Sequence, residues 1–167
     1  MLRWGVDFLR SIHSSSIALG ILFPAFLFLI QTVWSLYFVV RPASSVRAFL
    51  TYNRLLSVLV GIITLSGVAL SLMGLKTPIA TPGVKPGDSM VCGTLACQPL
   101  DPSRNWEHWM YTAFIVLSLV FVEVLLSGRL VERKVGARFL GIAAFFAFGA
   151  AIMVMRVVFL PGSTPGT

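Results

Sequence analysis

The chain has 167 residues, of which 57% are hydrophobic and only 11% are charged, and its formal net charge is +7. Soluble domains carry about a quarter of charged residues because their surfaces face water. This composition excludes a water-soluble body of this size, and the singly scattered basic residues do not form the stripe of a nucleic-acid binder. We therefore expect the lipid bilayer and other integral membrane subunits as partners, and no nucleic acid.

The N-terminal region predicts two helical segments of different kinds. Residues 1–10 mix apolar and charged side chains, which is typical of a short amphipathic helix lying in the membrane interface. The apolar run 17–40 is too long for the core of a signal peptide, so we interpret it as a retained first membrane span. A span needs about 20 apolar residues to cross a hydrocarbon core of about 30 Å.

The second and fourth predicted spans, 55–75 and 139–160, each carry small residues at three- and four-residue steps. This spacing places the small residues on one face of a helix, where a neighbouring backbone can approach closely. We interpret both faces as helix-packing surfaces. Their members are Gly61, Gly67, Ser71 and Gly74 in the second span, and Gly141 and Ala144 in the fourth.

The segment 76–108 separates the second span from the third, which covers 109–126. Its prolines and glycines favour turns and extended pieces over long helices. The sequence therefore predicts a single all-α membrane domain, 1–167, built as a four-transmembrane-helix bundle. A short N-terminal interfacial helix and one Pro-rich extracytoplasmic loop complete it.

The distribution of basic residues predicts how this bundle is oriented. The turns that join the first to the second span and the third to the fourth carry seven basic residues, against five on the opposite side. We expect both termini and the 76–108 loop on the extracytoplasmic side of a bacterial inner membrane or an equivalent membrane. The seven residues are Arg41, Arg47, Arg54, Arg129, Arg133, Lys134 and Arg138.

The two cysteines, Cys92 and Cys97, both fall in the predicted external loop. The four residues between them allow a disulfide to close, and an extracytoplasmic compartment permits it. A thiol oxidoreductase more typically uses Cys-x-x-Cys, and a zinc or iron–sulfur site needs more thiolates or histidines than this loop contains. A structural disulfide is the favoured interpretation.

The two histidines, His13 and His108, are predicted to open the first and third spans at the same face of the membrane. Two imidazoles at similar depth on different helices are suited to ligate a haem iron axially or to hold copper. The alternative is that both are ordinary polar residues of the membrane–water boundary, and the sequence leaves both readings open.

Two ionisable residues lie within predicted spans, where a charge is costly unless it is paired or hydrated. Glu123, in the third span, is interpreted either as a proton-transfer or cofactor contact, or as a structural partner of Arg54, of Arg129 or of a cation on another subunit. Arg156, near the outer end of the fourth span, is long enough to extend its guanidinium to the interface.

Three stretches resemble four-helix membrane proteins of the copper-resistance CopD and haem-biosynthesis HemJ type. They are His13 at the head of a first helix that closes with Arg41, the run from Arg54 to Ser71 that includes Thr64-Leu-Ser-Gly, and Gly128-Arg-Leu-Val-Glu-Arg-Lys134. The resemblance implies a role for a first-helix histidine, which His13 matches. The haem-linked members also use a third-helix lysine, and none occurs in 109–126, so protoporphyrinogen oxidation is not implied.

The functional expectation rests on the lack of a complete active site. The sequence has no phosphate-binding glycine loop, no dinucleotide fingerprint, no nucleophile elbow and no His-Glu-x-x-His helix. We expect no autonomous catalytic activity and an accessory role in a larger redox, respiratory or photosynthetic membrane complex. The alternative is a haem- or copper-binding membrane protein in electron transfer or metal handling, and a third hypothesis is a small enzyme or carrier centred on Glu123.

Overall fold

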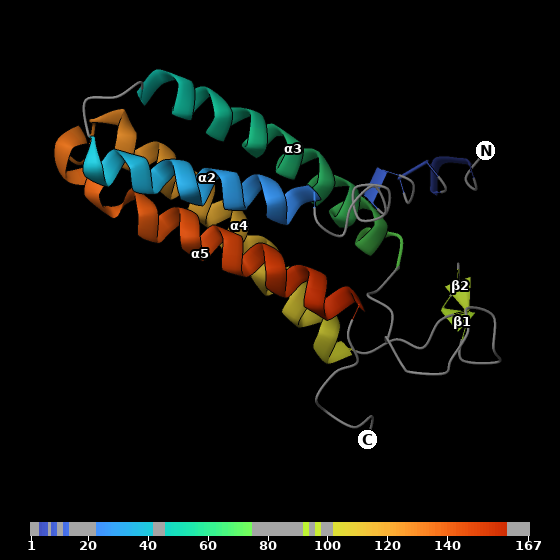
Figure 1. The fold of residues 1–167 in the computed structure, drawn as a ribbon. Helices are drawn as coiled ribbons and strands as arrows, with labels where there is room; N and C mark the ends of the chain where they lie inside the picture. Colours follow the sequence, from blue (N-terminus) through green and yellow to red (C-terminus); the bar gives the residue numbers. More distant parts are fainter. Residues whose placement is uncertain are drawn as a thin grey trace.

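The computed structural model describes residues 4–6, 8–9, 12–13, 23–41, 46–74, 92–93, 96–97 and 102–159. Within this part of the chain, long helices run alternately in opposite directions to form one bundle (Figure 1). The helices are α2 (Phe23–Val40), α3 (Val46–Leu72), α4 (Pro102–Ser127) and α5 (Arg133–Phe159). The strands β1 (Cys92–Gly93) and β2 (Ala96–Cys97) form a short antiparallel hairpin.

The described helices confirm a helical protein of membrane type. Three of them are long and apolar enough to cross a membrane, over Val46–Leu72, Asn105–Ser127 and Arg133–Val157. The described apolar part of α2, Pro24–Phe38, is shorter. The predicted first span starts at residue 17, and residues 17–22 lie outside the described part, so the count of four spans stays a prediction.

The helices extend beyond the apolar runs from which the spans were predicted. Helix α3 begins at Val46 rather than at 55, α4 at Pro102 rather than at 109, and α5 at Arg133 rather than at 139. Hydropathy detects only the part of a helix that suits lipid, whereas the helical backbone continues into polar residues. Proline is tolerated in a first helical turn, so Pro102 starts α4 and residues 102–108 of the predicted loop are helical.

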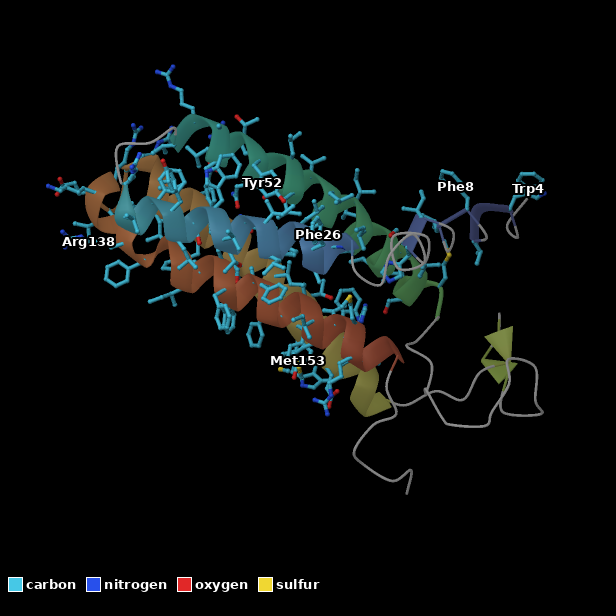
Figure 2. All side chains as sticks on the ribbon, viewed as in Figure 1. Trp4, Phe8, Phe26, Tyr52, Arg138 and Met153 are labelled. Carbon is cyan, nitrogen blue, oxygen red and sulfur yellow. The ribbon has the colours of Figure 1, made fainter. Side chains whose placement is uncertain are left out.

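The N-terminal region is helical at its described positions, 4–6, 8–9 and 12–13. Trp4 and Phe8 are 86% and 65% exposed, whereas Val6 between them is 4% exposed. In Figure 2, Trp4 and Phe8 lie beyond the end of the bundle. The charged residues of this segment lie outside the described part, so its amphipathic character and its position at a membrane interface stay predictions.

Helix α5 makes the most extensive contacts of the bundle, with α4 and then with α2. At Gly136 the backbone of α5 approaches α4 closely, because an added Cβ would lie 2.0 Å from the carbonyl oxygen of Leu125. On the side of α2, a Cβ at Gly141 would lie 3.1 Å from the Leu36 side chain. Alanines continue this surface, and they are buried: Ala137, Ala143, Ala144, Ala147, Ala150 and Ala151.

A hydrogen-bonded pair in the interior joins three helices. The Gln31 side chain of α2 donates to Oδ1 of Asn53 on α3 at 2.7 Å, and Asn53 Nδ2 donates to the Leu119 carbonyl of α4 at 3.3 Å. Both side chains are almost completely buried. Because hydrocarbon offers no hydrogen-bond partner, this pairing favours one register of α2 and α3 on α4.

The close contact at Gly136 generates a stability prediction. Gly136→Ala would push its methyl group into the Leu125 carbonyl and force α4 and α5 apart, so we expect a loss of about 1–3 kcal/mol in the free energy of unfolding. Gly149→Ala is the matched control on the same helix, because nothing lies within 4 Å of the added Cβ. Thermal unfolding in mild detergent measures both, and equal midpoints for the two variants would contradict the close crossing.

Candidate functional site

The structure brings His13 and His108 together, although they are far apart in the sequence. Their ring centroids are 6.0 Å apart and the ring planes are inclined at 69°. His13 belongs to the N-terminal helical segment and His108 to the second turn of α4, and both are partly buried. The two histidines are therefore neighbours at one end of the bundle, and their place at one face of the membrane stays a prediction.

Helix α3 fixes the orientation of the His13 ring. The Nδ1–H of His13 donates to the Ile63 carbonyl at 3.0 Å, and the Ser66 hydroxyl oxygen lies 3.3 Å from the same nitrogen. The Ser66 hydroxyl itself donates to the Ile63 carbonyl at 2.7 Å. A carbonyl can only accept, so Nδ1 carries the proton of the neutral ring and Nε2 carries the lone pair.

Gly67 provides the space in which the His13 ring lies. A Cβ at this position would lie 2.8 Å from Cε1 and 3.3 Å from Nδ1 of His13. Any larger residue would therefore displace the ring. Gly67 was predicted as a helix-packing residue, and the structure shows that its small size accommodates the histidine.

The surroundings of His13 favour its neutral form. Burial lowers the pKa of the imidazole below its ordinary value of 6.5, and the hydrogen bond to the Ile63 carbonyl raises it in part. Desolvation penalises the charged imidazolium, because the positive charge loses its hydration. A neutral imidazole is the form that binds metal ions.

His108 contributes a polar atom without a partner. Its Nδ1 is buried and has no hydrogen-bond partner in the described part of the chain. A buried polar nitrogen left unpaired costs free energy, so such an atom requires an explanation. An exogenous group that binds the imidazole would supply the missing partner.

The ring separation suits a shared metal ion. With metal–nitrogen bonds of about 2.0 Å, an ion bound to one nitrogen of each ring would hold the two centroids roughly 5 to 6 Å apart. The observed centroid separation of 6.0 Å lies at the upper end of this range. Among the described residues, no group of three or more His, Cys, Asp and Glu side chains gathers around a common point. Among the described residues the candidate site therefore consists of these two imidazoles, and we call it the two-imidazole site.

Glu123 is paired with Arg54, one of the partners that the sequence suggested. Arg54 Nε donates to Oε1 of Glu123 at 3.1 Å, and its Nη2 contacts the same oxygen at 2.5 Å. The Arg54 side chain is 67% exposed and that of Glu123 is 35% exposed. The pair links α3 to α4 on the outside of the bundle, close to the end opposite the histidines, and it lies apart from the two-imidazole site.

The other predicted residues belong to α3, to the residues that follow it and to α5. Gly141 and Ala144 pack within the bundle, whereas nothing lies within 4 Å of a Cβ added at Gly61. Gly74 follows the end of α3 with a φ of 84°, so it ends the helix in a left-handed conformation. Ser71 is half-buried in the last turn of α3, and Arg156 is exposed in the last turn of α5.

Several residues of the site were not identified from the sequence. The carbonyl of Ile63 and the hydroxyl of Ser66 hold His13, and neither has a sequence pattern that marks a histidine partner. Asn53 was also missed, although a buried amide beside the apolar run of a span is a recognisable signal.

For comparison with known proteins, no family model matches the chain, and neither a curated protein nor a solved structure does.

The contact at Gly67 generates a prediction about the His13 ring. Gly67→Ala should shift the ring and weaken its hydrogen bond to the Ile63 carbonyl, whereas Gly61→Ala on the same helix meets no atom within 4 Å. NMR of protein labelled with ¹⁵N-histidine should show a neutral, Nδ1-protonated His13 that only Gly67→Ala perturbs. Identical spectra for the two variants, or an Nε2-protonated His13, would contradict this geometry.

The ion pair between α3 and α4 generates a second prediction. Arg54→Glu and Glu123→Arg, made singly, place like charges together and should each lower the unfolding midpoint. The double variant restores an opposite pair and should recover most of the loss, which a double-mutant cycle detects. Additive losses in the double variant would show that the two side chains do not interact.

Proposed function

We propose that this chain is an integral membrane protein that binds a metal centre, a haem iron or a copper ion, between His13 and His108. The observation that carries the proposal is the contact of the two imidazoles at 6.0 Å, with one ring held by α3 and the other left with an unpartnered buried nitrogen. A role in electron transfer or metal handling follows from the chemistry of such a centre.

The two histidines have different roles in the proposed metal binding. His13 is the fixed ligand, because its Nδ1–H is held by Ile63 and Ser66 and its lone pair is thereby placed on Nε2. A hydrogen bond to the second ring nitrogen is the usual way in which proteins orient a ligating histidine. His108 is the ligand whose hydrogen bonding is incomplete without a bound group.

The choice between haem and copper rests on ligand chemistry. Imidazole suits both iron and copper, and a haem iron needs only two axial protein ligands because the macrocycle supplies the others. A bound haem or copper ion would add a redox-active centre near one end of the bundle. The resemblance to HemJ-type proteins, which depends in part on His13, supports the haem.

The test is the metal content and the optical spectrum of protein purified in mild detergent from membranes of cells grown with iron and copper. We expect a Soret band or bound copper in the native chain. His13→Ala and His108→Ala should each lower occupancy or affinity roughly tenfold or more, as expected when a metal loses an essential contact.

Trp106→Phe is the matched control, because this residue lies in the same turn of α4 and its side chain is 69% exposed. It should retain the bound centre. Native protein that carries neither haem nor copper, and that gains no histidine-dependent spectrum when haemin or copper is added, would overturn the proposal. So would single histidine variants that bind as well as the native chain.

A second proposal is that the chain is an accessory subunit of a larger membrane redox complex. The outer face of α3 favours it, because Gly61 has open space around it there and the neighbouring Val58, Ile62 and Leu65 are more than half exposed. Lipid is able to cover the apolar side chains as well, so this proposal is the weaker one. Mass spectrometry of the same preparation separates the two, since an accessory subunit copurifies with stoichiometric partners.

We also propose the disulfide between Cys92 and Cys97 and the predicted orientation of the helices. The hairpin supports the disulfide, because the two cysteines are directly paired across β1 and β2. Residues opposite each other in an antiparallel ladder have Cα atoms about 4.5–5.5 Å apart, within the range that a disulfide spans. The side chains of both cysteines lie outside the described part.

A further inference from the structure

Basic side chains gather at the end of the bundle that is opposite the histidines. At this end α2 and α4 finish and α3 and α5 begin (Figure 1). Figure 2 shows Arg138 pointing away from the bundle there. All members of this group, which we call the basic rim, are exposed, and they are Arg41, Arg47, Arg129, Arg133, Lys134 and Arg138.

Little negative charge balances the basic rim among the described residues. Glu132 is an exposed acidic residue of the turn between α4 and α5. Glu123 is nearby in sequence, but its carboxylate faces the guanidinium of Arg54 and the two charges offset each other. Six cations against one further anion leave a local charge of 6 − 1 = +5 at this end.

The turn between α4 and α5 holds part of the rim in a defined shape. Gly128 adopts a φ of 73°, and the backbone N–H of Arg129 donates to the Ser127 hydroxyl at 3.2 Å. The Arg133 side chain folds over this turn, and its Nη2 donates to the Ser127 carbonyl at 3.5 Å. The basic side chains of this turn are therefore attached to a compact, hydrogen-bonded backbone.

Exposed apolar side chains alternate with the basic ones. Leu130 lies between Arg129 and the start of α5 and is 79% exposed, and Val135 and Phe139 are 41% and 51% exposed. A surface that carries cations and apolar groups side by side matches the boundary between lipid headgroups and acyl chains. The same surface is poorly suited to a purely aqueous ligand, which would leave the apolar groups in water.

We propose that the basic rim binds the phosphate groups of anionic phospholipids, with a preference for headgroups that carry two phosphates. The basic side chains bind the phosphates while Leu130, Val135 and Phe139 contact the acyl chains. Clusters of Lys and Arg next to spanning helices attract anionic lipids, and basic pockets favour headgroups with several negative charges. This inference does not depend on the metal centre, which lies at the other end.

The test measures lipid retention and unfolding of the full chain in mild non-ionic detergent. The probes are a diphosphatidylglycerol, phosphatidylglycerol and phosphatidylcholine, each titrated separately, together with inorganic phosphate. We expect native mass spectrometry to show retention in that order, with the largest rise in the unfolding midpoint for the diphosphatidylglycerol. Inorganic phosphate should raise the midpoint little, because it offers no acyl chain to the apolar side chains.

The variant combining Arg129→Gln, Arg133→Gln and Lys134→Gln should lower retention of the diphosphatidylglycerol roughly tenfold or more, because each basic residue near an anionic surface strengthens binding several-fold. The matched control combines Lys76→Gln, Lys85→Gln and Arg104→Gln, which removes the same charge from residues that the sequence predicts on the opposite side of the membrane, and it should retain the lipid. If the rim variant does not fold, lipid retention is measured instead on the native chain in about 0.5–1 M salt. Salt at this concentration screens the attraction between exposed charges that are more than about 3–4 Å apart. Equal retention of phosphatidylcholine, or equal losses in the two variants, or retention that salt does not lower, would overturn the proposal.

Discussion

Helices α4 and α5 approach each other so closely that the backbone at Gly136 lies against the carbonyl of Leu125. Lipid is as apolar as the side chains that face it, so burial of apolar surface contributes little to holding such helices together. Close packing and a few hydrogen bonds must do so instead. The absence of a side chain at Gly136 and the row of alanines along α5 allow that packing, and α5 in turn supports α2.

The two-imidazole site depends on this arrangement through two connections. Helix α4 presents His108, and its position follows from the crossing with α5. Helix α3 holds His13, and α3 is attached to α4 by the Asn53–Leu119 hydrogen bond in the interior and by the Arg54–Glu123 pair on the outside. The distance between the rings is therefore set by how α3 lies on α4, which a displacement of either helix would change.

The membrane character and the presence of the helices could be predicted from the sequence, because hydropathy over about 20 residues is a strong signal. It also indicated that Glu123 needs a cation, because an isolated charge in a span is costly. It did not fix where the helices begin, since helical backbone continues past the apolar residues, as at Pro102. The spacing of Gly67 indicated a small face on α3, but spacing alone could not show that an imidazole occupies it. The contact between His13 and His108 depends on the tertiary arrangement, so the sequence could place them only at a common end.

We propose one metal centre held by two histidines from distant parts of the chain. X-ray absorption at the iron and copper edges of the native protein tests it most directly, because the first coordination shell reports the number and type of ligands. We expect an iron or copper edge whose shell contains two imidazole nitrogens at about 2.0 Å. A protein without either metal, or a metal whose shell contains no imidazole, would contradict it.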